Sequence, residues 1–163
     1  MKIELAKTEV IHFIGIGGIG MSGLSLIMKA KEFKVQGSDA ALNKNIERLR
    51  KEKIKVFIGH KKQHLKKATI VVVSSAIKKN NPELLEAKKK NLPIIKRGRM
   101  LAHIVSLMKN IVVVGSHGKT TTTSLVAAIF QKTKLDPTII NGGVINSLKN
   151  SAKLGKSDWS ILE

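Results

Sequence analysis

Short β-branched apolar runs alternate along the first part of the chain with longer segments whose apolar positions repeat at helical spacing. The apolar runs predict strands at 10–14, 34–37, 54–58, 69–74 and 92–95. The segments between them predict helices at 21–31, 43–53, 82–90 and 99–108. Strands that alternate with helices in this way form a parallel sheet with helices on both faces, so the pattern predicts an α/β domain.

The same pattern starts again near Asn110. The run IVVVG at 111–115 predicts a strand, a Gly-containing turn follows, and a Thr-rich segment through Gln131 predicts a helix. Residues 137–141 and the closing DWSILE predict two further strands. Because no low-complexity linker or internal repeat marks a boundary, this restart alone divides the chain into 1–108 and 109–163. The second part is expected to hold only the beginning of another α/β domain.

Charge changes the range of functions to consider. The 163 residues include 30 Lys and Arg against 11 Asp and Glu, a formal net charge of +19. Such a balance is typical of nucleic-acid-binding proteins, but it also arises from a Lys-rich solvated surface. The basic residues gather at 44–67 and 78–99, on predicted helices and turns, without an aromatic platform or a nucleic-acid motif. The distribution therefore favours the solvated surface, and we expect no nucleic-acid partner.

Two further features limit the class of protein. Cysteine is absent, which excludes a disulfide framework, a thiolate metal site and a cysteine nucleophile, and is compatible with a reducing cytosol. Residues 10–28 carry no formal charge, but five glycines interrupt them. Neither a signal peptide nor a membrane-spanning helix tolerates that many glycines well, so we expect no membrane insertion.

The first glycine-rich loop, GIGGIG at 15–20, lies between a predicted strand and a predicted helix and fits G-x-G-x-x-G. Glycines there let the backbone turn tightly and bring amide N–H groups against a diphosphate at a helix N-terminus. Asp39 follows the second strand, about 20 residues further on, as a dinucleotide-binding fingerprint expects. Two alternatives remain: a glycine-rich turn needed only for close packing, and an ordinary turn role for Asp39.

The second glycine-rich loop, GSHGKTTTT at 115–123, supplies the parts of a phosphate loop. Gly118, Lys119 and Thr120 offer, in order, close backbone approach, a cation for terminal phosphates and a hydroxyl for Mg²⁺. The general pattern G-x-x-x-x-G-K-[ST] requires glycine where this chain has Val113, so the loop is a shortened variant that begins at Gly115. The alternative is a solvated lysine at a helix N-terminus, which is the unfavourable end for an unliganded cation.

Seven segments together resemble the Mur ligases of peptidoglycan synthesis, in which a diphosphate-binding α/β domain precedes an ATP loop of the form G-[ST]-x-G-K-T. They are IHFIGIGGIGMSGLS (11–25), QGSD (36–39), SSAI (74–77), NPE (81–83), RGRMLA (97–102), GSHGKTTTTS (115–124) and NGG (141–143). The first loop resembles the member that joins L-alanine to UDP-N-acetylmuramate more than its relative that attaches a recycled tripeptide to the same sugar nucleotide. Ser116 departs from the family's usual threonine but keeps a hydroxyl.

The resemblance implies a Rossmann-like parallel-sheet domain that binds the UDP sugar, followed by the start of a P-loop-type α/β ATPase domain. The residues it implies for UDP-sugar binding are Gly15, Gly17, Gly18, Gly20, Ser38, Asp39, Ser75, Ala76, Ile77, Arg97, Asn141, Gly142 and Gly143. For two of these positions an alternative stays open, because Arg97 also fits a solvated basic turn and an Asn-Gly-Gly segment also fits an ordinary turn. We interpret His12, beside a strand, as structural.

ATP and Mg²⁺ are the cofactors that the resemblance implies. The residues implied for ATP binding are Gly115, Ser116, His117, Gly118, Lys119, Thr120 and Thr121, with Lys119 as the catalytic residue that stabilises the γ-phosphate. Thr120 and Glu163 would hold Mg²⁺, a hard cation that favours oxygen ligands. Glu163 aligns with the first acid of the family's E-A-D-E segment; the alternative is a frayed terminal residue.

The implied reaction takes place in the bacterial cytoplasm. ATP phosphorylates the lactyl carboxylate of UDP-N-acetylmuramate, and the amine of L-alanine attacks the acyl phosphate and displaces phosphate. The family's remaining ATPase strands and C-terminal domain lie outside these 163 residues, so we expect UDP-sugar binding with negligible ligase turnover. A nicotinamide-dependent dehydrogenase is a further alternative for the first loop, disfavoured because the second loop is of ATP type.

Overall fold

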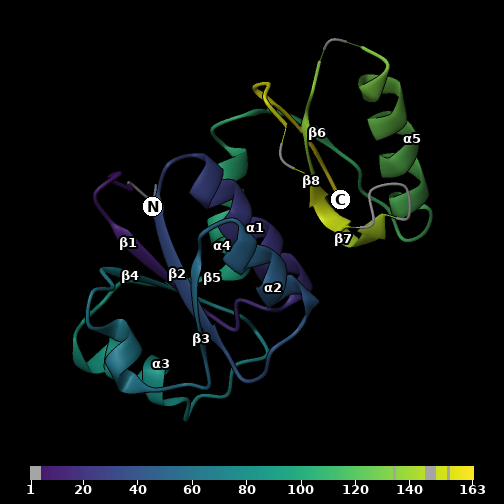
Figure 1. Ribbon diagram of the computed structural model, residues 1–163. Coiled ribbons are helices and arrows are strands. Elements are labelled where there is room, and N and C mark those ends of the chain that lie inside the picture. The colour runs from purple at the N-terminus through teal and green to yellow at the C-terminus, as the bar shows by residue number, and fades with distance from the viewer. Residues whose placement is uncertain (1–4, 134, 146–149, 154) are drawn as a thin grey trace. The chain divides into compact units, whose positions relative to one another are not determined.

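The computed structural model describes residues 5–133, 135–145, 150–153 and 155–163 (Figure 1). It divides into two compact units, which meet in sequence between His103 and Ile104. The restart of the sequence pattern placed this boundary slightly later, between 108 and 109. Within the described residues, no helix is long and apolar enough to cross a membrane.

The first unit is a five-stranded sheet in the order β3-β2-β1-β4-β5, with every pair of neighbouring strands parallel. Its strands are β1 (Val10–Ile14), β2 (Lys34–Asp39), β3 (Lys55–Ile58), β4 (Ile70–Val73) and β5 (Ile94–Lys96). Its helices are α1 (Ile19–Ala30), α2 (Lys44–Lys51), α3 (Pro82–Lys89), α4 (Arg97–Val105) and the 3₁₀ helix η1 (Lys62–Leu65). The α/β prediction is confirmed, and only η1 had no counterpart in it. Because the strand order reverses between β1 and β4, a ligand crevice is expected at their carboxyl ends.

The central strands of this sheet are buried and mostly apolar, as a parallel sheet covered by helices requires. Ile11, Phe13 and Ile14 of β1 are completely buried, with Val71 and Val72 of β4 beside them. Helices α1 and α2 lie together on one side of the sheet, while α3 lies on the other (Figure 1).

Local capping explains where the helices begin and end. The side chain of Asn43 accepts the amide hydrogen of Ile46 at the start of α2, and Asn81 does the same for two amides at the start of α3. After α1, α2 and α3 the chain turns through a left-handed residue, which is Glu32, Lys53 and Asn91 respectively. Such turns satisfy the last helical carbonyls and send the chain directly into the next strand or its approach.

The second unit is a four-stranded sheet in the order β6-β9-β7-β8, with β7 and β8 antiparallel and the other pairs parallel. Its elements are β6 (Lys109–Val112), α5 (Lys119–Gln131), β7 (Thr138–Ile145), β8 (Asn150–Lys153) and β9 (Trp159–Leu162). Ala127 of α5 packs against Ile139 and Ile161 in its core.

One expectation for the second unit was wrong in detail, and one strand was not predicted. The strand expected at 111–115 ends at Val112, and Val114 is 83% exposed because the chain already belongs to the glycine-rich loop there. Strand β8 was not predicted, because its sequence, NSAK, lacks the β-branched residues that mark a strand.

Candidate functional site

The first glycine-rich loop joins the carboxyl end of β1 to the N-terminus of α1. Gly15 has a φ of +82°, a left-handed conformation that favours glycine. The backbone N–H groups of Gly15 and Ile16 both donate to the carbonyl oxygen of Ser38, at 2.8 and 2.9 Å. Gly18 caps α1 without a side chain, so the first amides of the helix face the loop with no side-chain cap. This is the geometry by which a helix N-terminus receives an anion.

Asp39 supports this loop directly. Its Oδ2 accepts the backbone N–H of Gly17 at 2.7 Å, while the amide of Asn45 donates to the Gly17 carbonyl oxygen at 2.8 Å. A Cβ at Gly17 would lie 2.9 Å from the Asp39 carboxylate, so a larger residue there would displace that side chain from the loop. The resemblance implied that Asp39 binds the UDP sugar, and the structure shows that one of its carboxylate oxygens holds the loop.

Ser38 connects the first loop to the buried interior of the first unit. The residue is completely buried, its hydroxyl donates to Glu83 Oε2 at 2.5 Å, and its carbonyl holds the loop amides described above. Its expected contact with the UDP sugar stays a prediction.

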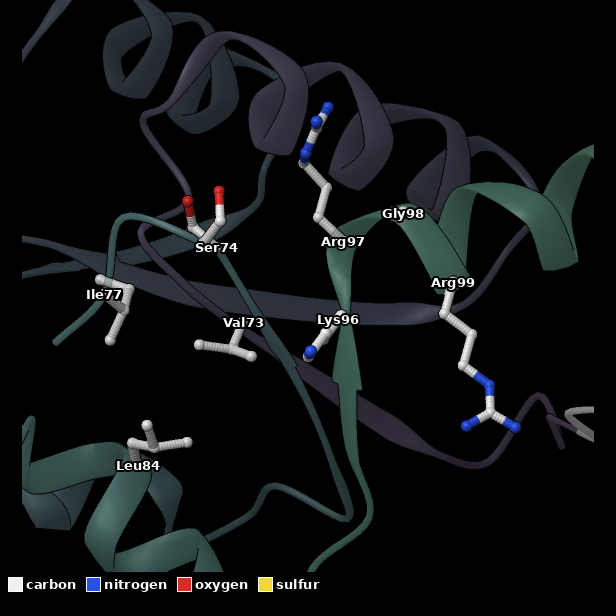
Figure 2. Close-up of a pocket in the computed structure, with 9 residues that line it drawn as sticks. Val73, Ser74, Ile77, Leu84, Lys96, Arg97, Gly98 and Arg99 are labelled. Carbon is white, nitrogen blue, oxygen red and sulfur yellow. The ribbon is translucent and has the colours of Figure 1, made fainter. Parts of the chain in front are cut away.

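A pocket of about 560 Å³ opens beyond the carboxyl ends of β4 and β5 (Figure 2). One side is apolar, formed by Val73, Ile77 and Leu84, and another is basic, where Lys96 and Arg97 stand. Of the residues expected to bind the UDP sugar, Ser75, Ile77 and Arg97 line this pocket. Ala76 is exposed in the same loop but is not part of the lining.

Arg97 connects the pocket to the glycine-rich loop. Figure 2 shows its side chain reaching from the start of α4 toward α1, whereas Arg99 points away. A Cβ at Gly20 would overlap Nη1 of Arg97, so the guanidinium lies against the first turn of α1. The positively charged guanidinium and the positive end of the α1 dipole thus lie side by side. Their mutual repulsion is relieved when an anion binds between them. This geometry favours the anion-binding interpretation of Arg97 over the solvated turn.

In the second unit, the other glycine-rich loop follows β6 and leads into α5. Gly118 caps α5 with a φ of +75°, so its conformation requires glycine even though a Cβ there would meet nothing within 4 Å. The ammonium of Lys119 folds back over the loop and donates to the carbonyl oxygens of Gly115 and Ser116, at 2.7 and 3.2 Å. Ser116, His117 and Thr121 are exposed around it.

The structure brings Thr120 and Glu163 together, although 43 residues separate them. Thr120 Oγ1 donates to Glu163 Oε1 at 3.1 Å, and Oε2 of Glu163 is buried without a hydrogen-bond partner among the described residues. The strands that precede the two residues, β6 and β9, are parallel neighbours. A hydroxyl and a carboxylate with a spare oxygen suit Mg²⁺, which takes one or two protein ligands and completes its shell with phosphates and water. Within the described residues, no group of three or more His, Asp or Glu could hold a metal.

The Asn141–Gly143 segment lies within β7 rather than in a turn, close to a shift in the register of β7 and β8 between Ile140 and Ile145. The side chains of these residues lie outside the described part of the structure. Their expected contact with the UDP sugar therefore stays a prediction.

Sequence reasoning missed a buried cluster under the first loop, centred on Glu83 of α3. Burial would raise the pKa of Glu83, but the neighbouring His12, Ser38 and His60 side chains outweigh it and lower the pKa to about 2. His12 is completely buried and accepts the amide of Gln36, which agrees with the structural role expected for it. The one available signal was the Asn-Pro-Glu triplet, which marks a helix start but not its partners.

A family model for the catalytic domain of Mur ligases matches residues 10–109, which include the first loop and the pocket. The chain belongs to the Mur ligase family. The resemblance drawn from the sequence motifs is thereby confirmed, whereas the second loop lies beyond the residues that this model matches.

Individual Mur ligases match more of the chain. It is 77% identical over all 163 residues to a UDP-N-acetylmuramate--L-alanine ligase from Pelagibacter ubique and 51% identical to one from Brucella ovis. These matches cover 35% and 34% of the two relatives, so the chain spans about a third of their length.

Two solved Mur ligase structures confirm the fold. The UDP-N-acetylmuramate-alanine ligase of Thermotoga maritima matches with a TM-score of 0.83 and 30% identity, over 93% of this chain and 36% of that one. A UDP-N-acetylmuramate:L-alanyl-gamma-D-glutamyl-meso-diaminopimelate ligase from Neisseria meningitides matches with a TM-score of 0.83 and 29% identity, over 95% of this chain and 52% of that one.

Proposed function

We propose that this chain forms the UDP-sugar-binding part and the ATP loop of a cytoplasmic ligase that joins L-alanine to UDP-N-acetylmuramate. The observation that carries the proposal is the anion site where Arg97 lies against Gly20 at the N-terminus of α1. A diphosphate fits such a site, and the neighbouring pocket of about 560 Å³ offers both apolar and basic walls for the rest of the ligand. The 77% identity to an L-alanine ligase along the whole chain supports the choice of substrate.

The second unit supplies the residues that would act on ATP. The side chain of Lys119 lies over its loop. When ATP binds, its ammonium group can leave the two carbonyl oxygens and donate hydrogen bonds to the terminal phosphates instead. Thr120 and Glu163 would hold Mg²⁺, which when bound neutralises charge on those phosphates. In the whole enzyme these residues would position ATP for attack by the lactyl carboxylate, and the amine of L-alanine would then displace phosphate from the acyl phosphate. We expect negligible turnover from this chain alone, because it spans about a third of its relatives.

A ligase that attaches a recycled tripeptide to the same sugar nucleotide is the second candidate. The solved tripeptide ligase matches with the same TM-score as the alanine ligase and nearly the same identity, so the fold favours neither substrate. Both candidates share the UDP sugar and ATP. They differ in the amine, which only an assay of the whole enzyme distinguishes.

Replacing Gly20 with alanine is expected to weaken UDP-N-acetylmuramate binding about 10-fold without unfolding the chain. The added Cβ meets only the end of the flexible Arg97 side chain, which must leave its place beside α1. Isothermal titration calorimetry measures the change. Gly98→Ala is the matched control, because Gly98 borders the same pocket and a Cβ there meets nothing within 4 Å. Stabilisation of the wild-type chain by duplex DNA but not by the UDP sugar would contradict the proposal.

Replacing Lys119 with alanine is expected to weaken ATP binding about 10- to 100-fold, because charge-assisted hydrogen bonds to the phosphates are lost. Fluorescence titration with a labelled ATP analogue measures the affinity. Lys132→Ala, at the far end of the same helix, is the control for a general loss of positive charge. Equal affinities for ATP in the Lys119 variant and the wild type would exclude the phosphate role of the loop.

A further inference from the structure

Glu83 lies in the first turn of α3 and is completely buried, yet it stands at the centre of four polar side chains. Its Oε2 is 2.5 Å from the hydroxyl of Ser38 and 2.8 Å from Nδ1 of His60. Its Oε1 is 2.7 Å from Nδ1 of His64 and 3.4 Å from Nε2 of His12. The partners come from β1, β2, η1 and the segment after β3, so one carboxylate joins four separate parts of the first unit.

The hydrogen bonds determine where the protons are. An ionised carboxylate only accepts, so Nδ1 of His60 and of His64 must carry a proton and donate it. In a neutral ring this leaves Nε2 as an unprotonated acceptor. His12 has the opposite arrangement, because its Nδ1 faces the Gln36 amide donor at 3.2 Å and its Nε2 therefore bears the proton. The ring of His64 is also held by Phe57, which stacks on it with centroids 4.2 Å apart.

Ser38 connects the cluster to the first glycine-rich loop. Its hydroxyl donates a hydrogen bond to Glu83, and its carbonyl oxygen accepts hydrogen bonds from the amides of Gly15 and Ile16. Directly after β3, the amide of Gly59 donates to the carbonyl oxygen of Asp39 at 2.7 Å, which places His60 next to the carboxyl end of β2. His60 retains partial solvent exposure, with 17% of its side chain accessible.

We propose that Glu83 is a positioning residue of the nucleotide-sugar site, which sets the first turn of the Gly15–Gly20 loop through Ser38 and fixes the His60 ring with Nε2 as an acceptor. This inference rests on the proposed function, since it concerns the same ligand. Glu83 itself does not touch the ligand, because it is completely buried.

Glu83→Gln distinguishes a positioning effect of Glu83 on ligand binding from the effect of its negative charge. The glutamine side chain keeps the size of glutamate but has one oxygen and one NH₂ group, and the NH₂ group donates hydrogen bonds and cannot accept one from a histidine N–H. At least one of the His60 and His64 rings must then move its proton to Nε2. The substitution also removes a negative charge, which by Coulomb's law should tighten the binding of a diphosphate. Weaker binding therefore identifies positioning, because the charge effect has the opposite sign.

The first measurement needs no ligand. Long-range ¹H–¹⁵N correlation spectra of the wild-type chain near pH 8 should show His60 and His64 protonated at Nδ1 and His12 protonated at Nε2. In Glu83→Gln at least one of the first two should change to the Nε2-protonated form. Wild-type spectra with His60 protonated at Nε2 would overturn the proposal, since Glu83 would then not hold this ring.

The second measurement is calorimetric titration with UDP-N-acetylmuramate. Glu83→Gln is expected to bind about 10-fold more weakly than the wild type, with ATP affinity unchanged in the second unit. Glu86→Gln is the matched control: it removes the same charge from the same helix, where Glu86 pairs with Lys90, and it should bind at least as well as wild type. Wild-type affinity in Glu83→Gln would overturn the proposal.

If Glu83→Gln fails to fold, Ser38→Ala tests the positioning role instead, because it removes only the hydroxyl that links Glu83 to the loop. Weaker UDP-sugar binding by folded Ser38→Ala supports the proposal, and unchanged binding overturns it. A wild-type chain that does not bind the UDP sugar at all would contradict the proposed function instead. The two failures are thus distinguishable.

Discussion

Gly37→Ala should destabilise the first unit by about 3 kcal/mol, near the upper end of the range for overpacking a buried site. Gly37 lies in the middle of β2 and is the register partner of Phe13 in β1. A Cβ at this position would lie 2.6 Å from the backbone carbonyl oxygen of Phe13 and 2.6 Å from Cδ1 of Ile16. A backbone oxygen of a central strand cannot move without separating β1 from its neighbours, so the strain has no inexpensive relief.

Urea unfolding followed by far-UV circular dichroism measures this loss. Trp159 belongs to the second unit, so its fluorescence should keep a near-wild-type transition if the damage is confined to the first. Gly98→Ala serves as the control, because a Cβ there meets nothing within 4 Å. If Gly37→Ala and Gly98→Ala unfold at the same urea concentration, the close packing of β2 against the first loop is not as described.

Acid should remove about 3 kcal/mol of stability that the ionised Glu83 contributes. Its pKa is lowered from 4.5 to about 2 in the folded chain, so the unfolded chain binds more protons between these two values. The contribution is therefore fully present above pH 4.5 and is lost as the pH falls through about 2. The physical cause is that protonation takes away the acceptor on which the Ser38 hydroxyl and the histidines converge.

The measurement compares the wild type with Glu83→Gln in urea unfolding at a series of pH values from 7 to 2. The difference between their unfolding free energies should stay level above about pH 5 and shrink by about 3 kcal/mol toward pH 2. Asp136, whose pKa is lowered by the hydrogen bond from Lys153, is present in both proteins and cancels in the difference. If the unfolding free energies of the two proteins change in parallel over the whole pH range, Glu83 is not held as a carboxylate by its neighbours.

Sequence reasoning succeeded where the signal is local. The first loop between β1 and α1 and the second loop before α5 were both recognisable, because glycines, a following lysine and hydroxyl, and the flanking apolar runs are close together in the chain. It failed where the signal is weak or absent, as for β8, and it did not reveal that Ser38 is completely buried. The burial of a residue depends on which distant segments pack over it, and the local sequence pattern carries no information about those segments.

The sequence by itself determined the α/β class, the position of both phosphate-type loops and the membership of the Mur ligase family, because each of these depends on residues that are neighbours in the chain. Only the tertiary structure decided that Arg97 lies against Gly20, that Thr120 meets Glu163 and that Glu83 gathers three histidines. The physical reason is strand order. A parallel sheet brings the carboxyl ends of distant strands to one edge, and which ends become neighbours depends on the packing of the whole unit.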